Sequence, residues 1–172
     1  MLEKIIYNII IAFNIQHFNV PYPRGVKQLT VIGLTGGTGA GKGCVCSIFS
    51  KYGIDSIDTD KTSREVCCAG SPCLKELVSN FGNDILNPDR SLNRKELAKI
   101  PFASESNHKT LNSITHKYIL EQVRLWLDGQ KKQNKIAAIV DAPLLFESKF
   151  DKECDVIISV QAPASVRVDR II

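Results

Sequence analysis

The chain has 172 residues, of which 44% are hydrophobic and 23% are charged, and its net charge is +4. This length suits one domain with a sizeable core, and the composition is that of a globular protein, which excludes a disordered or fibrous class. The small positive excess favours polyanionic small molecules such as nucleotides as ligands and argues against DNA or RNA.

Residues 1–28 contain an apolar run at 5–13 that is interrupted by Asn8. The run is too short and too polar to span a bilayer, and no small-residue cleavage motif follows it, so the sequence predicts no membrane association. We interpret residues 1–28 as an extension outside the domain, either poorly ordered or read from a start codon upstream of the native one. Residues 21–25, which include two prolines and a glycine, would form the linker.

The chain contains six cysteines: Cys44, Cys46, Cys67, Cys68, Cys73 and Cys154. They form no CxxC pair and do not alternate with histidines, which excludes the common zinc sites. Because the sequence lacks a convincing secretory signal, we expect these thiols to be reduced and the protein to be cytoplasmic.

Two short strands and a helix are expected in the first part of the domain. Residues 29–34 form an apolar run that ends in glycines, as a buried parallel strand does. Residues 42–52 show helical spacing, and Gly53 is a natural helix stop. A second strand is predicted at 54–57, and an acidic turn follows it.

The middle of the chain is purely helical in pattern, and we interpret residues from about 61 to 130 as a helical, substrate-binding insert. The predicted helices are 61–68, 72–81, 93–100, 105–113 and 115–128. Pro72 occupies the first turn of its helix, and Gly129 is expected to close the last one.

Two further strands, at 136–140 and 156–160, and a helix that opens at Pro163 and runs to residue 172 complete the pattern. Strands that alternate with helices imply a parallel sheet covered on both faces. The sequence therefore predicts an α/β fold, a three-layer α/β/α sandwich, for residues 29–172.

A glycine-rich loop between the first strand and the first helix fits the Walker A pattern G-x-x-x-x-G-K. Its glycines let successive backbone N–H groups face a phosphate, and the helix that follows presents its positive end to the same anion. The lysine supplies a mobile charge for the β- and γ-phosphates of ATP. The predicted phosphate-binding residues are Gly37, Thr38, Gly39, Ala40, Gly41, Lys42, Gly43 and Cys44.

The loop departs from the usual pattern directly after its lysine. Gly43 stands where many P-loops have the serine or threonine that binds Mg²⁺, and Cys44 stands where some nucleotide kinases have a threonine instead. A thiol is a poor ligand for Mg²⁺. We expect phosphate binding to survive and metal positioning to suffer.

The acidic turn after the second strand brings two carboxylates toward the same loop. Asp58 and Asp60 follow a strand end, and ligands of open α/β sheets bind at the carboxyl ends of the strands. A carboxylate there can accept a proton from an attacking hydroxyl or help to hold a metal ion. The alternative is that Asp60 caps the next helix.

In combination, these motifs resemble the dephospho-coenzyme A kinase family over about residues 29–172. The resemblance rests on Gly33–Gly37, Ile57–Asp60, Arg64-Glu65, Phe81–Leu86, Leu92–Leu97, Leu111–His116 and Asp141–Glu147. It implies an enzyme that transfers the γ-phosphoryl group of ATP, with Mg²⁺, to the ribose 3′-hydroxyl of dephospho-coenzyme A, the last step of coenzyme A biosynthesis. A monomer is expected.

The resemblance also assigns roles to individual residues. It implies that Asp60 activates the acceptor hydroxyl, that Asp141 holds Mg²⁺ through water, and that Arg170 neutralises charge at the start of a lid. The acceptor-binding residues that it implies are Asp60, Arg64, His116, Pro143 and Leu144. Each has a plainer alternative: a helix cap for Asp141, a structural histidine for His116, and exposed helix positions for Arg64 and Arg170.

Family members continue beyond this point with the rest of the lid and a fifth strand, so we expect the given chain to be incomplete at its C-terminus and to be weakly active or inactive. Two alternative functions stay open. One is another P-loop nucleoside or nucleotide kinase. The other is a nucleotide-binding protein without activity, which Gly43 and Cys44 favour.

Overall fold

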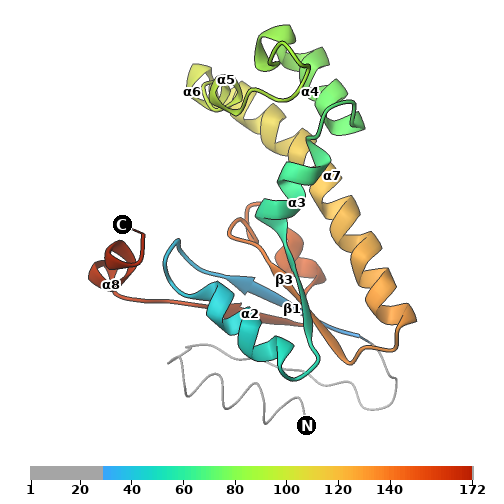
Figure 1. Cartoon of the computed structure of the whole chain (residues 1–172), viewed down its shortest axis with the longest axis vertical. Helices are drawn as coiled ribbons and strands as arrows, with labels where there is room; N and C mark the ends of the chain where they lie inside the picture. The colour runs from blue at the N-terminus through green and yellow to red at the C-terminus, as the bar shows by residue number, and fades with distance from the viewer. Residues whose placement is uncertain (1–28, 172) are drawn as a thin grey trace. The chain divides into compact units, whose positions relative to one another are not determined.

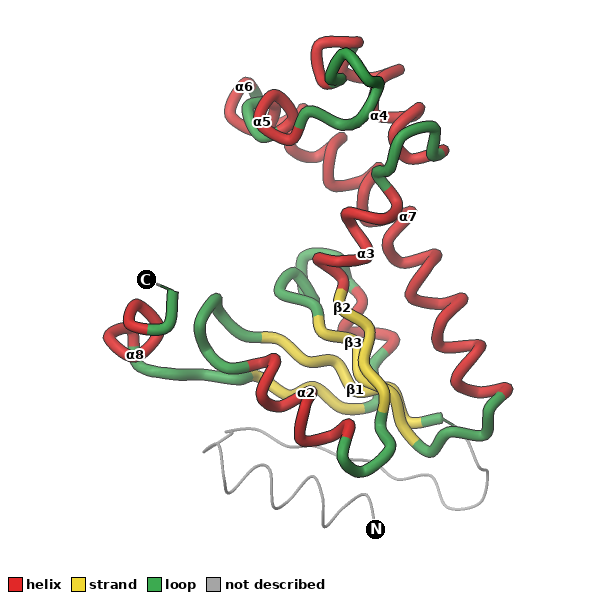
Figure 2. The backbone as a smooth tube through the Cα atoms, viewed as in Figure 1, coloured by secondary structure: helices red, strands yellow, loops and turns green. Residues whose placement is uncertain are grey.

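The computed structural model describes residues 29–171, and the interpretation of residues 1–28 lies outside this range. Four strands form one sheet (Figures 1 and 2), in the order β2-β3-β1-β4 with every pair parallel. The strands are β1 (Thr30–Thr35), β2 (Asp55–Asp58), β3 (Ala137–Asp141) and β4 (Val156–Ser159). The prediction of an α/β fold with a parallel sheet is confirmed, and the strand bounds differ from the predicted ones by one residue.

Helices connect and flank the strands. They are α2 (Lys42–Ser50), α3 (Thr59–Val66), α4 (Pro72–Phe81), α5 (Arg94–Leu97), α6 (Ile100–Ala103), α7 (Glu105–Lys132) and α8 (Ala164–Asp169). Two 3₁₀ turns, η1 (Asn83–Ile85) and η2 (Phe150–Glu153), accompany them. Within residues 29–171, no helix combines the length and the hydropathy that a bilayer crossing requires.

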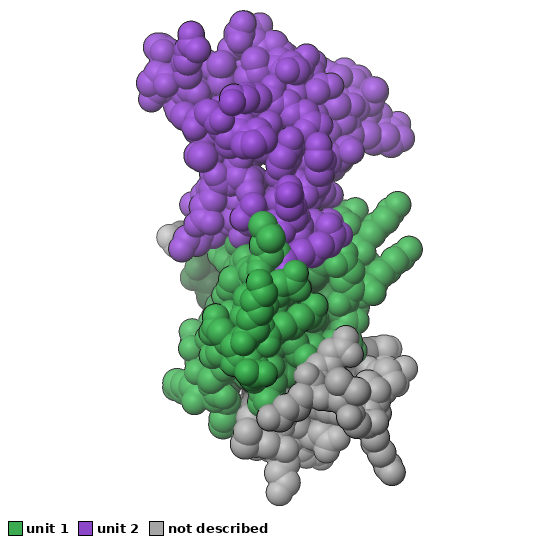
Figure 3. All heavy atoms as spheres, turned by 90° about the vertical axis from the view of Figure 1, so that its right-hand side faces the viewer, with its two compact units in different colours: residues 1–59, 125–172 green, residues 60–124 purple. Residues whose placement is uncertain are grey.

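The chain divides into two compact units (Figure 3). Unit 1 is made of residues 1–59 and 125–172 and contains the sheet, and unit 2 is made of residues 60–124.

The core of unit 1 lies between the sheet and α2. Val45 and Phe49, four residues apart on one face of α2, are fully buried against the strands. The cluster that they join is Ile32, Leu34, Ala40, Ile54, Ala137, Ile139, Val156, Ile158 and Val160. Because the apolar positions of β1 and β3 run without polar interruption, both strands are buried as the interior of a parallel sheet.

Unit 2 has its own hydrophobic core, made of residues from α4, α7 and the turns between helices: Cys67, Cys73, Leu74, Leu77, Ile85, Leu92, Leu111 and Ile114. The start of α4 follows from its sequence. Pro72 occupies the first turn, and the Ser71 hydroxyl accepts a hydrogen bond of 3.1 Å from the backbone N–H of Leu74.

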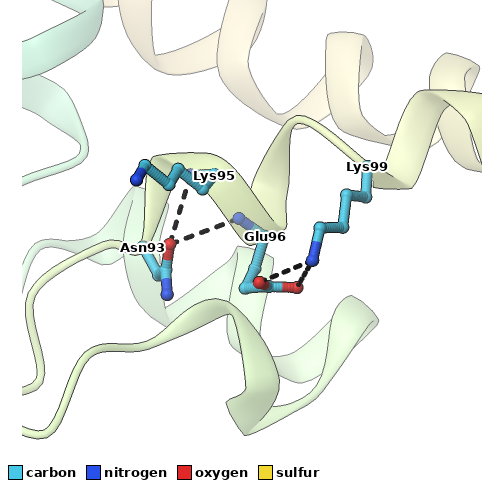
Figure 4. Close-up of polar contacts among 4 residues, drawn as sticks. All are labelled: Asn93, Lys95, Glu96 and Lys99. Carbon is cyan, nitrogen blue, oxygen red and sulfur yellow. Dashed lines mark hydrogen bonds and ion pairs between the residues drawn. The ribbon is translucent and has the colours of Figure 1, made fainter.

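The predicted helix at 93–100 is wrong in extent, because α5 ends at Leu97 and α6 begins at Ile100. Pro101 lacks the N–H that a continuous helix would direct to the carbonyl of Leu97. Figure 4 shows the start of α5, where the Asn93 side-chain oxygen accepts from the N–H groups of Lys95 and Glu96, both at 3.2 Å. Lys99 and Glu96 form an exposed ion pair at 2.7 Å.

Three other helix predictions also need correction. Residues 105–113 and 115–128 belong to one helix, α7, which passes through Gly129 and ends at Lys132. The Thr115 hydroxyl donates to the Leu111 carbonyl at 2.9 Å, which satisfies it inside the helix, and one interior glycine costs only about 1 kcal/mol. The last predicted helix is shorter than expected, since α8 ends at Asp169.

Candidate active site

The glycine-rich loop joins β1 to α2, as its sequence predicts. Gly41 is the N-cap of α2 and has a left-handed backbone, with φ of 108°. The ammonium group of Lys42 donates a hydrogen bond of 3.0 Å to the carbonyl oxygen of Gly36 at the start of the loop. Lys42 therefore folds back across the loop, over the surface where a phosphate would meet the helix N-terminus.

Gly36 lies at the point where the loop leaves the sheet, and no other residue fits there. Its φ is 142°, and a Cβ atom on it would collide with the carbonyl oxygen of Val160. The same segment is tied to β1 by the N–H of Val160, which donates to the Thr35 carbonyl at 2.8 Å. The start of the loop is thus fixed by backbone packing.

The carboxyl ends of the strands gather acidic side chains beside the loop. Asp58 and Asp141 are register partners in β2 and β3, and Asp141 is also the register partner of Leu34 in β1. Burial first, and then the carboxylates of Asp141 and Asp58, raise the pKa of the Cys46 thiol on α2. The carboxylates of Asp58 and Asp141 therefore lie close enough to the middle of α2 to disfavour the thiolate of Cys46.

Pro143 is held against the end of β1. The Thr35 hydroxyl, which is buried, donates to the Pro143 carbonyl at 3.3 Å, and the N–H of Ala142 donates to the Leu34 carbonyl at 2.9 Å. The next residue, Leu144, is 52% exposed. An exposed apolar side chain beside the strand ends is a suitable contact for an organic acceptor.

Arg170 contacts the loop directly. Its Nη1 donates to the carbonyl oxygens of Gly39 at 3.1 Å and Ala40 at 3.3 Å, and α8 lies beside this loop (Figure 1). Arg167, one turn earlier on α8, also lies against the loop and was not among the predicted site residues. Its spacing of three residues from Arg170, which places both on one face of a helix, was the available signal.

Asp60, Arg64 and His116 belong to unit 2. Asp60 and Arg64 lie on α3, one turn apart, and His116 lies on α7 and is half-buried. The chain connects Asp60 to the strand ends through Thr59, whose hydroxyl donates to the Asp141 carbonyl at 3.1 Å. Asp60 is the second residue after the end of β2.

Unit 2 also contains an open pocket of about 400 Å³ between α3, α4 and α7. Glu65 and Glu121 line it together with Cys73 and Tyr118. The Tyr118 hydroxyl donates to Glu76 at 2.6 Å and Lys117 pairs with Glu76 at 2.9 Å, and these two contacts lower the pKa of Glu76. Two glutamates make the pocket a poor binding site for a phosphate group.

All six cysteines are free, and Cys44 is exposed in the first turn of α2. Within residues 29–171, no group of three or more His, Cys, Asp or Glu side chains is arranged to hold a metal ion. What unit 1 offers is a glycine-rich loop of the Walker A pattern with a lysine, next to two strand-end carboxylates. That arrangement suits a nucleotide whose phosphates lie on the loop.

Comparison with known proteins identifies the family. The family model described as dephospho-CoA kinase matches residues 30–172. The chain belongs to the dephospho-CoA kinase family. A dephospho-CoA kinase from Moorella thermoacetica is 42% identical over 142 residues, which cover 82% of this chain and 67% of that protein. The enzyme of the same name from Corynebacterium efficiens is also 42% identical, over 82% of this chain and 70% of that protein.

Solved structures agree on the fold. A crystal structure of a Thermus thermophilus protein matches with a TM-score of 0.68 at 24% identity, over 84% of this chain and 71% of that one. The dephospho-CoA kinase from Campylobacter jejuni matches with a TM-score of 0.58 at 20% identity, over 84% and 94%. The family resemblance that the sequence motifs predicted is therefore confirmed, and with it a phosphotransferase that uses ATP.

Proposed function

We propose that this chain transfers the γ-phosphoryl group of ATP to the ribose 3′-hydroxyl of dephospho-coenzyme A and so forms coenzyme A. The main support for this proposal is that the chain belongs to the dephospho-CoA kinase family. The geometry of unit 1 supports it, since the Walker A loop with Lys42 lies beside the ends of the strands that carry Asp58 and Asp141.

In the proposed mechanism, backbone N–H groups of residues 37–44 and the ammonium group of Lys42 bind the phosphates of ATP. Asp60 accepts the proton of the acceptor hydroxyl, while Arg64, His116, Pro143 and Leu144 bind the acceptor. Catalysis in this reaction comes from positioning the reacting groups and neutralising their charge rather than from covalent chemistry. Arg170, which lies on the loop, would add positive charge near the phosphates.

The residues present fit Mg²⁺. Magnesium prefers oxygen ligands and is usually held by one or two carboxylates together with water and substrate phosphates. Asp141 and Asp58, adjacent in register at the strand ends, would supply such carboxylates, Asp141 through water. When bound, the ion would neutralise charge on the β- and γ-phosphates.

The identity of the acceptor that is phosphorylated distinguishes this function from the alternatives. The chain should be assayed with ATP and Mg²⁺ against dephospho-coenzyme A and, separately, against nucleoside monophosphates and nucleosides. We expect phosphorylation of dephospho-coenzyme A, with coenzyme A identified by mass spectrometry. Preferred phosphorylation of a nucleoside or its monophosphate would favour another P-loop kinase. ATP binding in a calorimeter without transfer to any acceptor would favour a protein without activity.

Cys44 should limit the use of magnesium. Replacing Cys44 with Thr puts a hydroxyl oxygen in the first turn of α2, where a thiol now lies. We expect the Mg²⁺ concentration for half-maximal turnover, and the concentration that half-saturates Mg²⁺-dependent ATP binding, to fall by about tenfold. Cys68→Thr, at another exposed cysteine, is the control. If C44T needs as much Mg²⁺ as wild type and C68T, residue 44 does not contribute to metal binding.

We also propose a cytoplasmic location, which the six free cysteines support. A monomeric state stays a prediction.

A further inference from the structure

The side chain and backbone of Arg167 both lie against the glycine-rich loop, a contact that the sequence did not predict. Its Nη1 lies 2.5 Å from the position that a Cβ atom on Gly37 would occupy. The carbonyl oxygen of Arg167 lies 2.7 Å from the corresponding position on Gly39. The backbone of Arg167 fits against Gly39 only because Gly39 lacks a side chain, and the missing Cβ of Gly37 leaves the room that the guanidinium group occupies beside the loop backbone.

Arg167, in α8, and Arg170, the residue that caps the end of α8, differ in the hydrogen bonds that they donate. Arg170 donates to two loop carbonyls, those of Gly39 and Ala40. Arg167 is half-buried, and its Nε is shielded from solvent without a hydrogen-bond partner among residues 29–171. A buried charged donor without a partner is unfavourable, and an oxygen of a bound anion would satisfy it.

The loop and α2 have no negative side chain of their own, which favours an anion as that partner, while the carboxylates of Asp58 and Asp141 lie at the strand ends beside the loop. Between residues 36 and 51 the sequence has no acidic side chain, and Lys42 and Arg170 also reach the loop. The first turn of α2 contains no acidic residue either, so the positive end of its dipole is not neutralised there. Cys44 offers no hydroxyl oxygen for a metal ion, which leaves more of the phosphate charge to be balanced by side chains.

We propose that Arg167 is a phosphate-binding residue, which donates to a phosphate oxygen of the nucleoside triphosphate held by the loop, beside Lys42. The inference rests on the proposed function only in taking a nucleoside triphosphate as the ligand. Arg167 acts on binding, and it does not need the phosphoryl transfer step.

The test compares Arg167→Gln with wild type and with Arg90→Gln, a matched change at an exposed arginine of unit 2. Binding of ATP, AMP and inorganic triphosphate is measured by calorimetry, and thermal unfolding is measured without ligand. We expect R167Q to bind ATP and inorganic triphosphate about tenfold more weakly, with a smaller loss for AMP and less sensitivity to salt. We expect its unfolding temperature without ligand to be unchanged, and R90Q to match wild type in every measurement.

Several results would overturn the inference. One is an affinity of R167Q for ATP and triphosphate within twofold of that of wild type. Another is an equal loss of affinity for ATP and AMP together with a lower unfolding temperature, which would indicate a structural role. If R167Q does not fold, Arg167→Lys keeps the charge and should retain most of the triphosphate affinity. Loss of that affinity in R167K would also count against the inference.

If wild type binds ATP but phosphorylates no acceptor, the proposed function fails while the role of Arg167 stands. If wild type binds neither ATP nor triphosphate, both fail.

Discussion

Replacing Lys42 with Ala should lower kcat/KM for ATP by about 10²–10³-fold, the range seen when one electrostatic contact to developing charge is removed. The ammonium group supplies the positive charge at the loop, and its 3.0 Å bond to the Gly36 carbonyl holds it where we propose that phosphate binds. Steady-state kinetics with varied ATP, together with calorimetric ATP binding, measures the effect.

Lys51→Ala is the matched control. Lys51 is exposed and caps the other end of α2, so its loss removes the same charge from the same helix at a distance from the loop. K51A should behave as wild type. Wild-type ATP affinity and turnover in K42A would mean that nucleotide binds elsewhere.

Replacing Asp60 with Asn should reduce kcat by about 10²–10⁴-fold and leave the Kd for ATP nearly unchanged. The amide keeps the size of the carboxylate but cannot accept the proton of the acceptor hydroxyl. Single-turnover assays with saturating ATP and dephospho-coenzyme A measure the loss in the transfer step, and calorimetry measures ATP binding separately.

Asp128→Asn serves as the control for this variant, because Asp128 is exposed on α7 and pairs only across the surface with Lys131 at 3.3 Å. D128N should retain full turnover. An equal loss of turnover and ATP affinity in D60N would argue that Asp60 stabilises the first turn of α3 and is not the base.

The loop and the strand ends were predictable because their signals are local. An apolar run that ends in glycines and a lysine fixes β1, the loop and α2, and parallel pairing then brings Asp58 and Asp141 to one edge of the sheet. The roles of Asp60, Arg64 and His116 came from the family resemblance, and they stay predictions.

Helix ends were less predictable, because competing interactions decide them. In the sequence Gly129 predicts the end of the helix, yet α7 continues through it. Burial of Val123 and Leu127 on the preceding turns stabilises the helix by more than one glycine costs.

Arg167 was not predicted for a different reason. Its spacing of three residues from Arg170 indicates that both lie on one face of a helix, but nothing in a single sequence shows that this face meets Gly37, which lies 130 positions earlier in the chain.

The bond between Lys42 and the Gly36 carbonyl has a consequence for how ATP affinity should be interpreted. A free lysine side chain loses about 2 kcal/mol of conformational entropy when it is fixed, and here much of that loss occurs as the protein folds. An arriving nucleotide exchanges one acceptor of the ammonium group for another and does not have to order a mobile chain. The affinity lost in K42A therefore measures the difference between a phosphate oxygen and a backbone carbonyl as partners, and it understates the strength of the phosphate contact itself.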